Sequence, residues 1–165
     1  PKPRRPRSTQ TKSAFVVLIG HAVFVGPAPE MLMRKVTTRP PSFPTVQFDS
    51  PVASKAGRTW QVLCGDQNHW RAGVYSPAEV SASELLELEQ HDCPELFLLI
   101  SGRLVIVIAE ESGIRELELE RGTPVLIQSP HSGYCPDGPH TGTAFVVERD
   151  SFDTEYRASQ EWTRR

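Results

Sequence analysis

The sequence is poor in cysteine. Its three cysteines, Cys64, Cys93 and Cys135, lie far apart in a chain of 165 residues, and no two of them form a C-x-x-C pair. This spacing excludes a disulfide framework and a zinc knuckle, which need more cysteines at closer intervals. Unpaired cysteines are typical of a reducing compartment, so we expect a cytoplasmic protein.

The sequence also lacks an excess of charge of either sign. It has 18 Lys and Arg against 20 Asp and Glu, which gives a net charge of −2. A binding face for nucleic acid or for an anionic membrane needs basic residues in excess. The length suits a single core. We therefore expect a one-domain protein that binds a small molecule, without nucleic acid or membrane as a partner.

No apolar run is long enough to cross a membrane. The longest, over residues 14–25, falls short of the roughly 20 residues that span a bilayer. It follows a basic, proline-rich start that has the order of a signal peptide, but residues 26–30 make a poor cleavage site. A flexible leader, or sequence upstream of a start at Met31 or Met33, is the other interpretation. We predict a flexible leader over residues 1–36, a folded domain over 37–157 and a tail over 158–165.

The rest of the chain has the pattern of an all-β protein. Prolines between residues 40 and 51 favour extended chain and deny helix. Beyond them, seven short apolar or β-branched runs follow one another, separated by turn signals such as Ser101-Gly102, which predicts a sandwich or a barrel. The predicted strands are Thr59–Cys64, His69–Tyr75, Leu96–Ile100, Leu104–Ile108, Ile114–Leu119, Pro124–Ile127 and Thr143–Glu148.

The segment from Ser81 to Leu88 has two interpretations. Ser81 and Glu84 have the spacing of a helix capping box, whereas the alternation of leucine with glutamate is typical of a strand. We favour the strand, because it brings His91 to the same face as Glu89.

A group of possible metal ligands lies in the middle of the chain. His91-x3-Glu95-x6-Gly102 is followed by Gly122, and His131 stands nine residues later. Alternate residues of a barrel strand face the interior, so ligands from separate strands can converge there. Two imidazoles and one carboxylate on one face leave coordination positions open, which suits Fe(II) best, with Zn, Mn and Ni as alternatives.

Two further residues compete for places in this site. Glu89 is either a fourth ligand or one more solvated acid of an acidic strand. His140 follows a proline, as His131 does, but His131 fits the spacing from Gly122 better. Between the two histidines, residues 132–141 are rich in Gly and Pro and form either a flap over the barrel mouth or a polar surface loop.

These motifs resemble the two-part motif of the cupin superfamily, H-x-H-x3,4-E-x6-G followed by a histidine about ten residues after a glycine. The resemblance covers about half the chain and implies a double-stranded β-helix, or jelly-roll barrel, with a metal held by His91, Glu95 and His131. Glu89 stands where the superfamily has its first histidine.

Within the cupins, Pro130-His131-Ser132 and the run from Thr143 to Arg149 are similar to 3-hydroxyanthranilate 3,4-dioxygenases. This resemblance implies that Glu148 contacts the substrate. Glu87 and Cys135 stand where that family has substrate-binding arginines, so an anthranilate carboxylate would lack its bidentate partner. We therefore expect that 3-hydroxyanthranilate is not the main substrate.

Together these observations predict a metal-dependent cupin that acts as an Fe(II) dioxygenase-type oxidoreductase on a small polar or aromatic molecule. The alternatives are an isomerase or lyase on the same metal, and a cupin that binds a small ligand without turnover. A homodimer is expected to form through an early strand between Thr45 and Cys64. The expected substrate-binding residues are Phe97, Tyr134, Phe145 and Glu148, and the last of these is also the expected catalytic residue.

Overall fold

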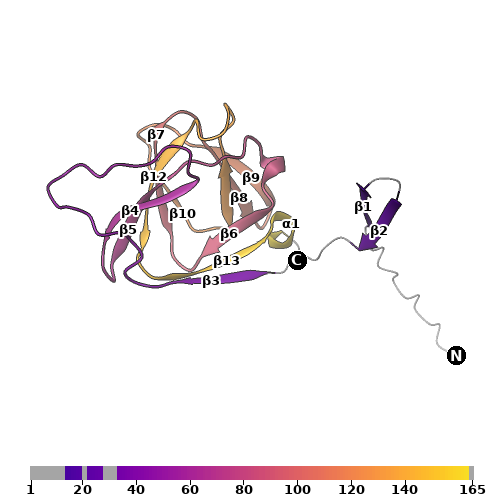
Figure 1. The fold of residues 1–165 in the computed structure, drawn as a ribbon, viewed down its shortest axis with the longest axis horizontal. Coiled ribbons are helices and arrows are strands. Elements are labelled where there is room, and N and C mark those ends of the chain that lie inside the picture. Colours follow the sequence, from indigo (N-terminus) through magenta and orange to yellow (C-terminus); the bar gives the residue numbers. More distant parts are fainter. Residues whose placement is uncertain (1–13, 20–21, 28–32, 164–165) are drawn as a thin grey trace. The chain divides into compact units, whose positions relative to one another are not determined.

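The computed structural model describes residues 14–19, 22–27 and 33–163, which belong to two separate units (Figure 1). In the first unit, β1 (Ala14–Ile19) pairs antiparallel with β2 (Ala22–Pro27). Both strands fall in the segment expected to be a flexible leader; its residues 1–13, 20–21 and 28–32 lie outside the described part.

The second unit consists of two antiparallel sheets. One has five strands in the order β10 (Val125–Ile127), β7 (Glu95–Ser101), β12 (Thr143–Arg149), β5 (Trp70–Tyr75) and β4 (Trp60–Asp66). The other has six, in the order β3 (Arg34–Thr38), β13 (Phe152–Ala158), β6 (Glu87–His91), β11 (His131–Tyr134), β8 (Val105–Glu110) and β9 (Gly113–Glu118).

Successive strands mostly alternate between the two sheets. The chain changes sheet between β5 and β6, again between β6 and β7, and again between β7 and β8, as a jelly-roll barrel requires. The expected all-β class is confirmed, and each of the seven predicted runs overlaps a strand. The structure adds β3, β11 and β13, so the six-stranded sheet begins at Arg34, inside the predicted leader.

The segment before β6 differs from the expected continuous strand. Residues Ala82–Glu84 form a short 3₁₀ helix, and the strand begins only at Glu87. The turn is favoured because the Glu84 carboxylate accepts a hydrogen bond from the backbone N–H of Val80 at 2.8 Å. As a result Leu86 is exposed while Leu88 is fully buried, so these two leucines do not share a face.

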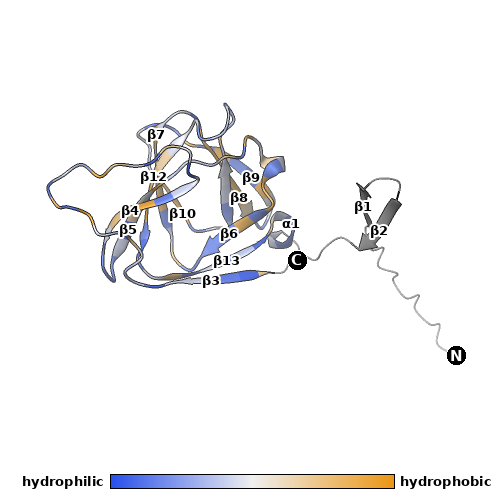
Figure 2. Ribbon diagram, in the orientation of Figure 1, coloured by the Kyte–Doolittle hydropathy of each residue, from blue (hydrophilic) through white to orange (hydrophobic). Residues whose placement is uncertain are grey.

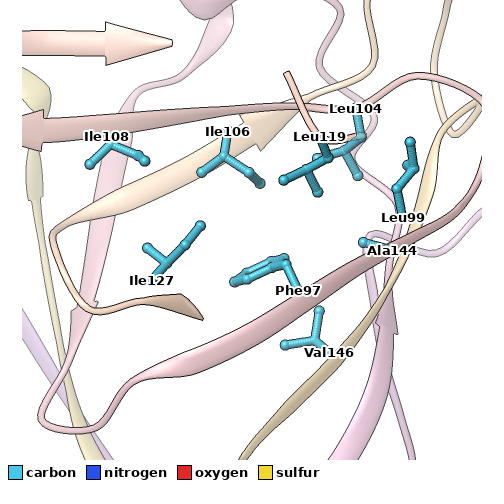
Figure 3. Packing of buried hydrophobic residues seen from close by; sticks show 9 residues of the cluster. All are labelled: Phe97, Leu99, Leu104, Ile106, Ile108, Leu119, Ile127, Ala144 and Val146. Carbon is cyan, nitrogen blue, oxygen red and sulfur yellow. The ribbon is translucent and has the colours of Figure 1, made fainter. Parts of the chain in front are cut away.

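The main core lies between the sheets, and its side chains converge in Figure 3. It consists of Phe97, Leu99, Leu104, Ile106, Ile108, Leu119, Ile127, Ala144 and Val146. Strand β8 is buried on both faces, because Val107 and Ala109 pack with Leu88 in a second cluster that Trp162 of the helix α1 (Ser159–Trp162) partly covers. The predicted tail therefore contributes to the packing. By contrast, the edge strand β3 is largely hydrophilic (Figure 2).

Candidate metal centre

The site is built around the corner between β6 and β7. His91 ends β6 in one sheet and Glu95 begins β7 in the other. A backbone hydrogen bond from Asp92 N to the Asp153 carbonyl, at 3.0 Å, fixes the corner. Because the chain crosses from sheet to sheet here, two side chains only four residues apart face each other, and His91 Nε2 lies 3.0 Å from Glu95 Oε1.

His131 approaches the same carboxylate from β11. Its backbone is opposite Glu89 in the ladder between β11 and β6. Its Nε2 lies 2.9 Å from Glu95 Oε2, so the two oxygens of Glu95 each face one imidazole. His91, Glu95 and His131 are all buried. The structure thus brings together the three residues predicted as ligands.

The outer nitrogen of each imidazole is also held. His91 Nδ1 lies 2.7 Å from Thr154 Oγ1, and His131 Nδ1 lies 3.0 Å from the Ser129 carbonyl oxygen. Metal-ligating histidines typically have such partners, which fix the ring and its tautomer. Both ring nitrogens of His131 therefore face oxygen atoms. The Ser129 carbonyl can only accept, so Nδ1 carries a proton. This arrangement suits either a ring protonated on both nitrogens or a ring that carries Nδ1–H and turns Nε2 toward a cation.

The electrostatics of the three residues are strongly coupled. Burial opposes charge on Glu95, but hydrogen bonds from His131 and His91 outweigh it and hold the Glu95 pKa well below its ordinary value. Burial would lower the pKa of His131, yet the hydrogen bond and charge of Glu95 outweigh burial and raise that pKa above 6.5. The protein therefore favours a positive charge on His131 beside an ionised Glu95.

Two more carboxylates reach this region. Glu89 Oε2 lies 3.9 Å from His91 Nε2. Glu148, on β12, accepts a hydrogen bond at 2.7 Å from Arg71 through Oε1, while its buried Oε2 has no hydrogen-bond partner. Burial, followed by the neighbouring Glu95 carboxylate, raises the pKa of Glu148 to about 9.

The donor set fits a divalent cation. Glu89, His91 and His131 each offer a ligand atom within 4.8 Å of the others, and so do His91, Glu95 and Glu148. Two ligands at about 2.1 Å from a cation and at right angles to each other lie about 3.0 Å apart. Each imidazole nitrogen has this separation from a different oxygen of Glu95: His91 Nε2 lies 3.0 Å from Oε1 and His131 Nε2 lies 2.9 Å from Oε2. The unpartnered Oε2 of Glu148 is a further oxygen that a cation or its ligand would satisfy.

These groups line a cavity of about 270 Å³. Of the expected substrate-binding residues, Phe97 and Glu148 line it. Tyr134 and Phe145 are not among its walls: Tyr134 packs on the second cluster and donates to Glu116, and Phe145 follows Ala144 on the opposite face of β12. His140 is also outside the cavity, with Nδ1 against the Ser76 carbonyl.

Sequence reasoning missed Arg71, which lines the cavity from β5, and the aromatic walls Trp60, Tyr75, Phe152 and Tyr156. The strand over residues 69–75 was predicted, and its alternation places Arg71 on the same face as Tyr75. That pattern was the available signal, but it did not show which face turns inward.

No protein-family model and no curated protein matches the sequence. Solved structures resemble it in fold. A cupin-2 domain containing protein from Shewanella frigidimarina NCIMB 400 is 14% identical, with 59% of this chain and 84% of that chain covered and a TM-score of 0.43. Hydroxypropylphosphonic acid epoxidase from S. wedmorenis, in complex with fosfomycin, is 14% identical over 53% and 48% of the two chains, with a TM-score of 0.42. DMSP lyase DddQ from Ruegeria pomeroyi DSS-3 is 22% identical over 55% and 45%, with a TM-score of 0.40.

All three identities are below 25% and all three TM-scores are below 0.5, and this chain spans about half the length of the last two proteins. None of the three is a 3-hydroxyanthranilate dioxygenase, so that closer resemblance stays a prediction. Within the described residues, we find no helix with the length and apolar character of a bilayer span.

Proposed function

We propose that this barrel binds one divalent cation through His91, Glu95 and His131, with Glu89 as a fourth ligand, and that it is a metal-dependent enzyme for a small molecule. The observation that carries the proposal is the convergence of two imidazole Nε2 atoms on one buried carboxylate, at 3.0 and 2.9 Å, at the wall of a cavity. Metal-ligating histidines typically hold their second ring nitrogen on a partner, and both Nδ1 atoms have one here.

The charges in the cavity support the same conclusion. Glu89, Glu95 and Glu148 line it, and Arg71 is the arginine among its lining residues. Buried carboxylates are costly unless they are paired. Arg71 already pairs with Glu148, so one divalent cation would balance the two remaining carboxylates, Glu89 and Glu95.

Fe(II) is the favoured cation, with Zn, Mn and Ni as alternatives, because nitrogen and oxygen ligands with open positions suit all of them. Bound Fe(II) would supply the redox chemistry of a dioxygenase. The chain itself would hold the substrate in a cavity whose walls, such as Phe97 and Trp60, exclude water. Glu148 would orient the substrate by hydrogen bonding.

A metal-dependent isomerase or lyase is the second candidate, and the state of Glu148 favours it. A carboxyl group with a pKa of about 9 carries a proton at neutral pH and can donate it to a bound substrate. A dioxygenase and a lyase differ in whether they consume oxygen, so oxygen uptake separates the two functions.

The metal centre is tested by metal content per chain after anaerobic loading with Fe(II) and, separately, with Zn(II). We expect one equivalent in the wild type, and less than a tenth of that in His131→Gln and Glu95→Gln, which keep side-chain volume but lose a ligand. His140→Gln is the matched control and should keep the full equivalent, since His140 lies outside the cavity. No metal in the wild type, or loss in His140→Gln alone, would contradict the proposal.

The activity is tested on the Fe(II)-loaded chain with a panel of small aromatic acids, phenols and aliphatic acids. An oxygen electrode and product chromatography are read together. Oxygen uptake that follows substrate and is absent in His131→Gln supports the dioxygenase. Product formed without oxygen uptake supports the isomerase or lyase, and no product at all supports a ligand-binding cupin.

A further inference from the structure

Arg71 has a place in the cavity that the metal centre does not account for. It lies on β5, and the strand turns residues 71, 73 and 75 to the same face. Arg71 and Tyr75 line the cavity. The side chain of Arg71 is only 12% exposed, so its guanidinium is held among protein groups rather than in bulk water.

The Arg71 guanidinium is held by a hydrogen bond on its Nε edge and lies near two aromatic rings. Its Nε donates to Glu148 Oε1 at 2.7 Å. Its carbon lies 4.8 Å from the ring centre of Phe152 and 5.9 Å from that of Trp60. Among the described residues, the Arg71 side chain donates only this hydrogen bond from Nε, so its Nη groups can donate to a ligand. A guanidinium with its orientation fixed and two donors spare matches a carboxylate.

Gly73 makes this arrangement possible. A Cβ at this position would lie 2.6 Å from Cη2 of Trp60 and 2.7 Å from the Gln61 carbonyl oxygen. The absence of a side chain therefore lets the indole lie across the strand between Arg71 and Tyr75. The result is a flat aromatic wall next to a fixed positive charge.

We propose that Arg71 is the anion-binding residue of this cavity and that the ligand is a small monocarboxylate with a flat, apolar body. A single negative charge is favoured because Arg71 supplies one positive charge and the Glu148 carboxyl group, which accepts from its Nε, already lies beside it. The cavity of about 270 Å³ lies just below the range of drug-sized ligands, which begins at roughly 300 Å³, so it suits a single ring. The identity of this ligand as a substrate rests on the proposed function; the anion site itself does not.

The test uses three probes with the same ring: benzoate, benzamide and phenylphosphonate. Each is titrated by calorimetry into the full Zn(II)-loaded chain. We expect benzoate to bind at least about tenfold more tightly than benzamide, since one charge-assisted contact corresponds to such a factor. Phenylphosphonate should bind more weakly than benzoate. Equal binding of benzoate and benzamide, or tighter binding of phenylphosphonate, would overturn the proposal.

Variants at the ion pair make the test specific. Arg71→Gln should weaken benzoate by at least about tenfold and benzamide by less than about twofold. Glu148→Gln should strengthen benzoate binding, because it removes the carboxylate that competes for the guanidinium. A purely structural ion pair predicts no gain in Glu148→Gln. If Arg71→Gln does not fold, the double variant Arg71→Gln/Glu148→Gln replaces it, because it keeps the summed charge of the pair. The double variant should also lose the preference for benzoate over benzamide.

Zinc content is measured in every sample, so the two proposals fail separately. Bound zinc with benzoate affinity unchanged in Arg71→Gln refutes the anion site and leaves the metal centre standing. No bound zinc, with benzoate affinity that still depends on Arg71, refutes the metal centre and supports the anion site.

Discussion

Loading the barrel with a cation should stabilise the fold, because the proposed ligands come from both sheets. Glu89, His91 and His131 belong to the six-stranded sheet and Glu95 to the five-stranded sheet. Unfolding separates the two sheets, so the unfolded chain does not assemble the site. At a free cation concentration about 100 times the dissociation constant, binding to the folded state alone adds about 2.7 kcal/mol. For a chain of this length that corresponds to a rise in Tm of about 5–11 °C.

Differential scanning calorimetry with Zn(II), against the same sample in chelator, measures this rise. His131→Gln should lose it, and His140→Gln should keep it. A wild type whose Tm does not move at saturating zinc would refute the reasoning, and so would a His131→Gln variant whose Tm rises as much as that of the wild type. A shift in all three proteins would point to zinc bound outside the cavity.

Three further outcomes are expected. Cation affinity should fall as pH is lowered through the raised pKa of His131, because a proton then competes for the ring. Without a cation, in chelator, His131 should contribute fully to stability below pH 6.5, and this contribution should be lost as pH rises through its folded pKa. Urea unfolding of His131→Gln against the wild type at several pH values checks this. Leu88→Ala should lower the free energy of unfolding by about 2–5 kcal/mol while one cation per chain is retained, since Leu88 is fully buried on the face away from the cavity. The exposed edge of β4, within the early segment expected to mediate a dimer, should pair with a second copy, so sedimentation at micromolar concentration should show a homodimer and a monomer would refute it.

The sequence predicted the strands that alternate in hydrophobicity and the ligands that follow a spaced motif. Leu117 and Leu119 alternate with glutamates, and both leucines pack on the core. His91, Glu95 and His131 could be predicted together because the strand period decides which side chains share an interior. The start of β6 could not be predicted, because the hydrogen bond from Val80 N to the Glu84 carboxylate stabilises a local turn that competes with the strand.

The missed features depend on contacts between distant segments. Strand β11 contains a glycine and only four residues, and it exists because β8 and β6 pair with it on either side. Arg71 was overlooked because an arginine on a strand is ordinarily at the surface, and only the pairing of β5 with β12 sets it beside Glu148. The expectation that 3-hydroxyanthranilate would lack a guanidinium partner assumed that no arginine reaches the cavity, and Arg71 does.

Gly102 shows that one sequence motif can carry two unrelated requirements. His91 ends β6 and Glu95 begins β7, whereas Gly102 follows the last residue of β7, roughly 20 Å from Glu95 at the usual strand rise. Gly102 has a φ of +64°, and a Cβ there would collide with the backbone carbonyl of Thr141, so the residue closes the far end of the barrel. The need for glycine at position 102 is therefore one of backbone geometry, and it would hold whether or not His91 and Glu95 bound a cation.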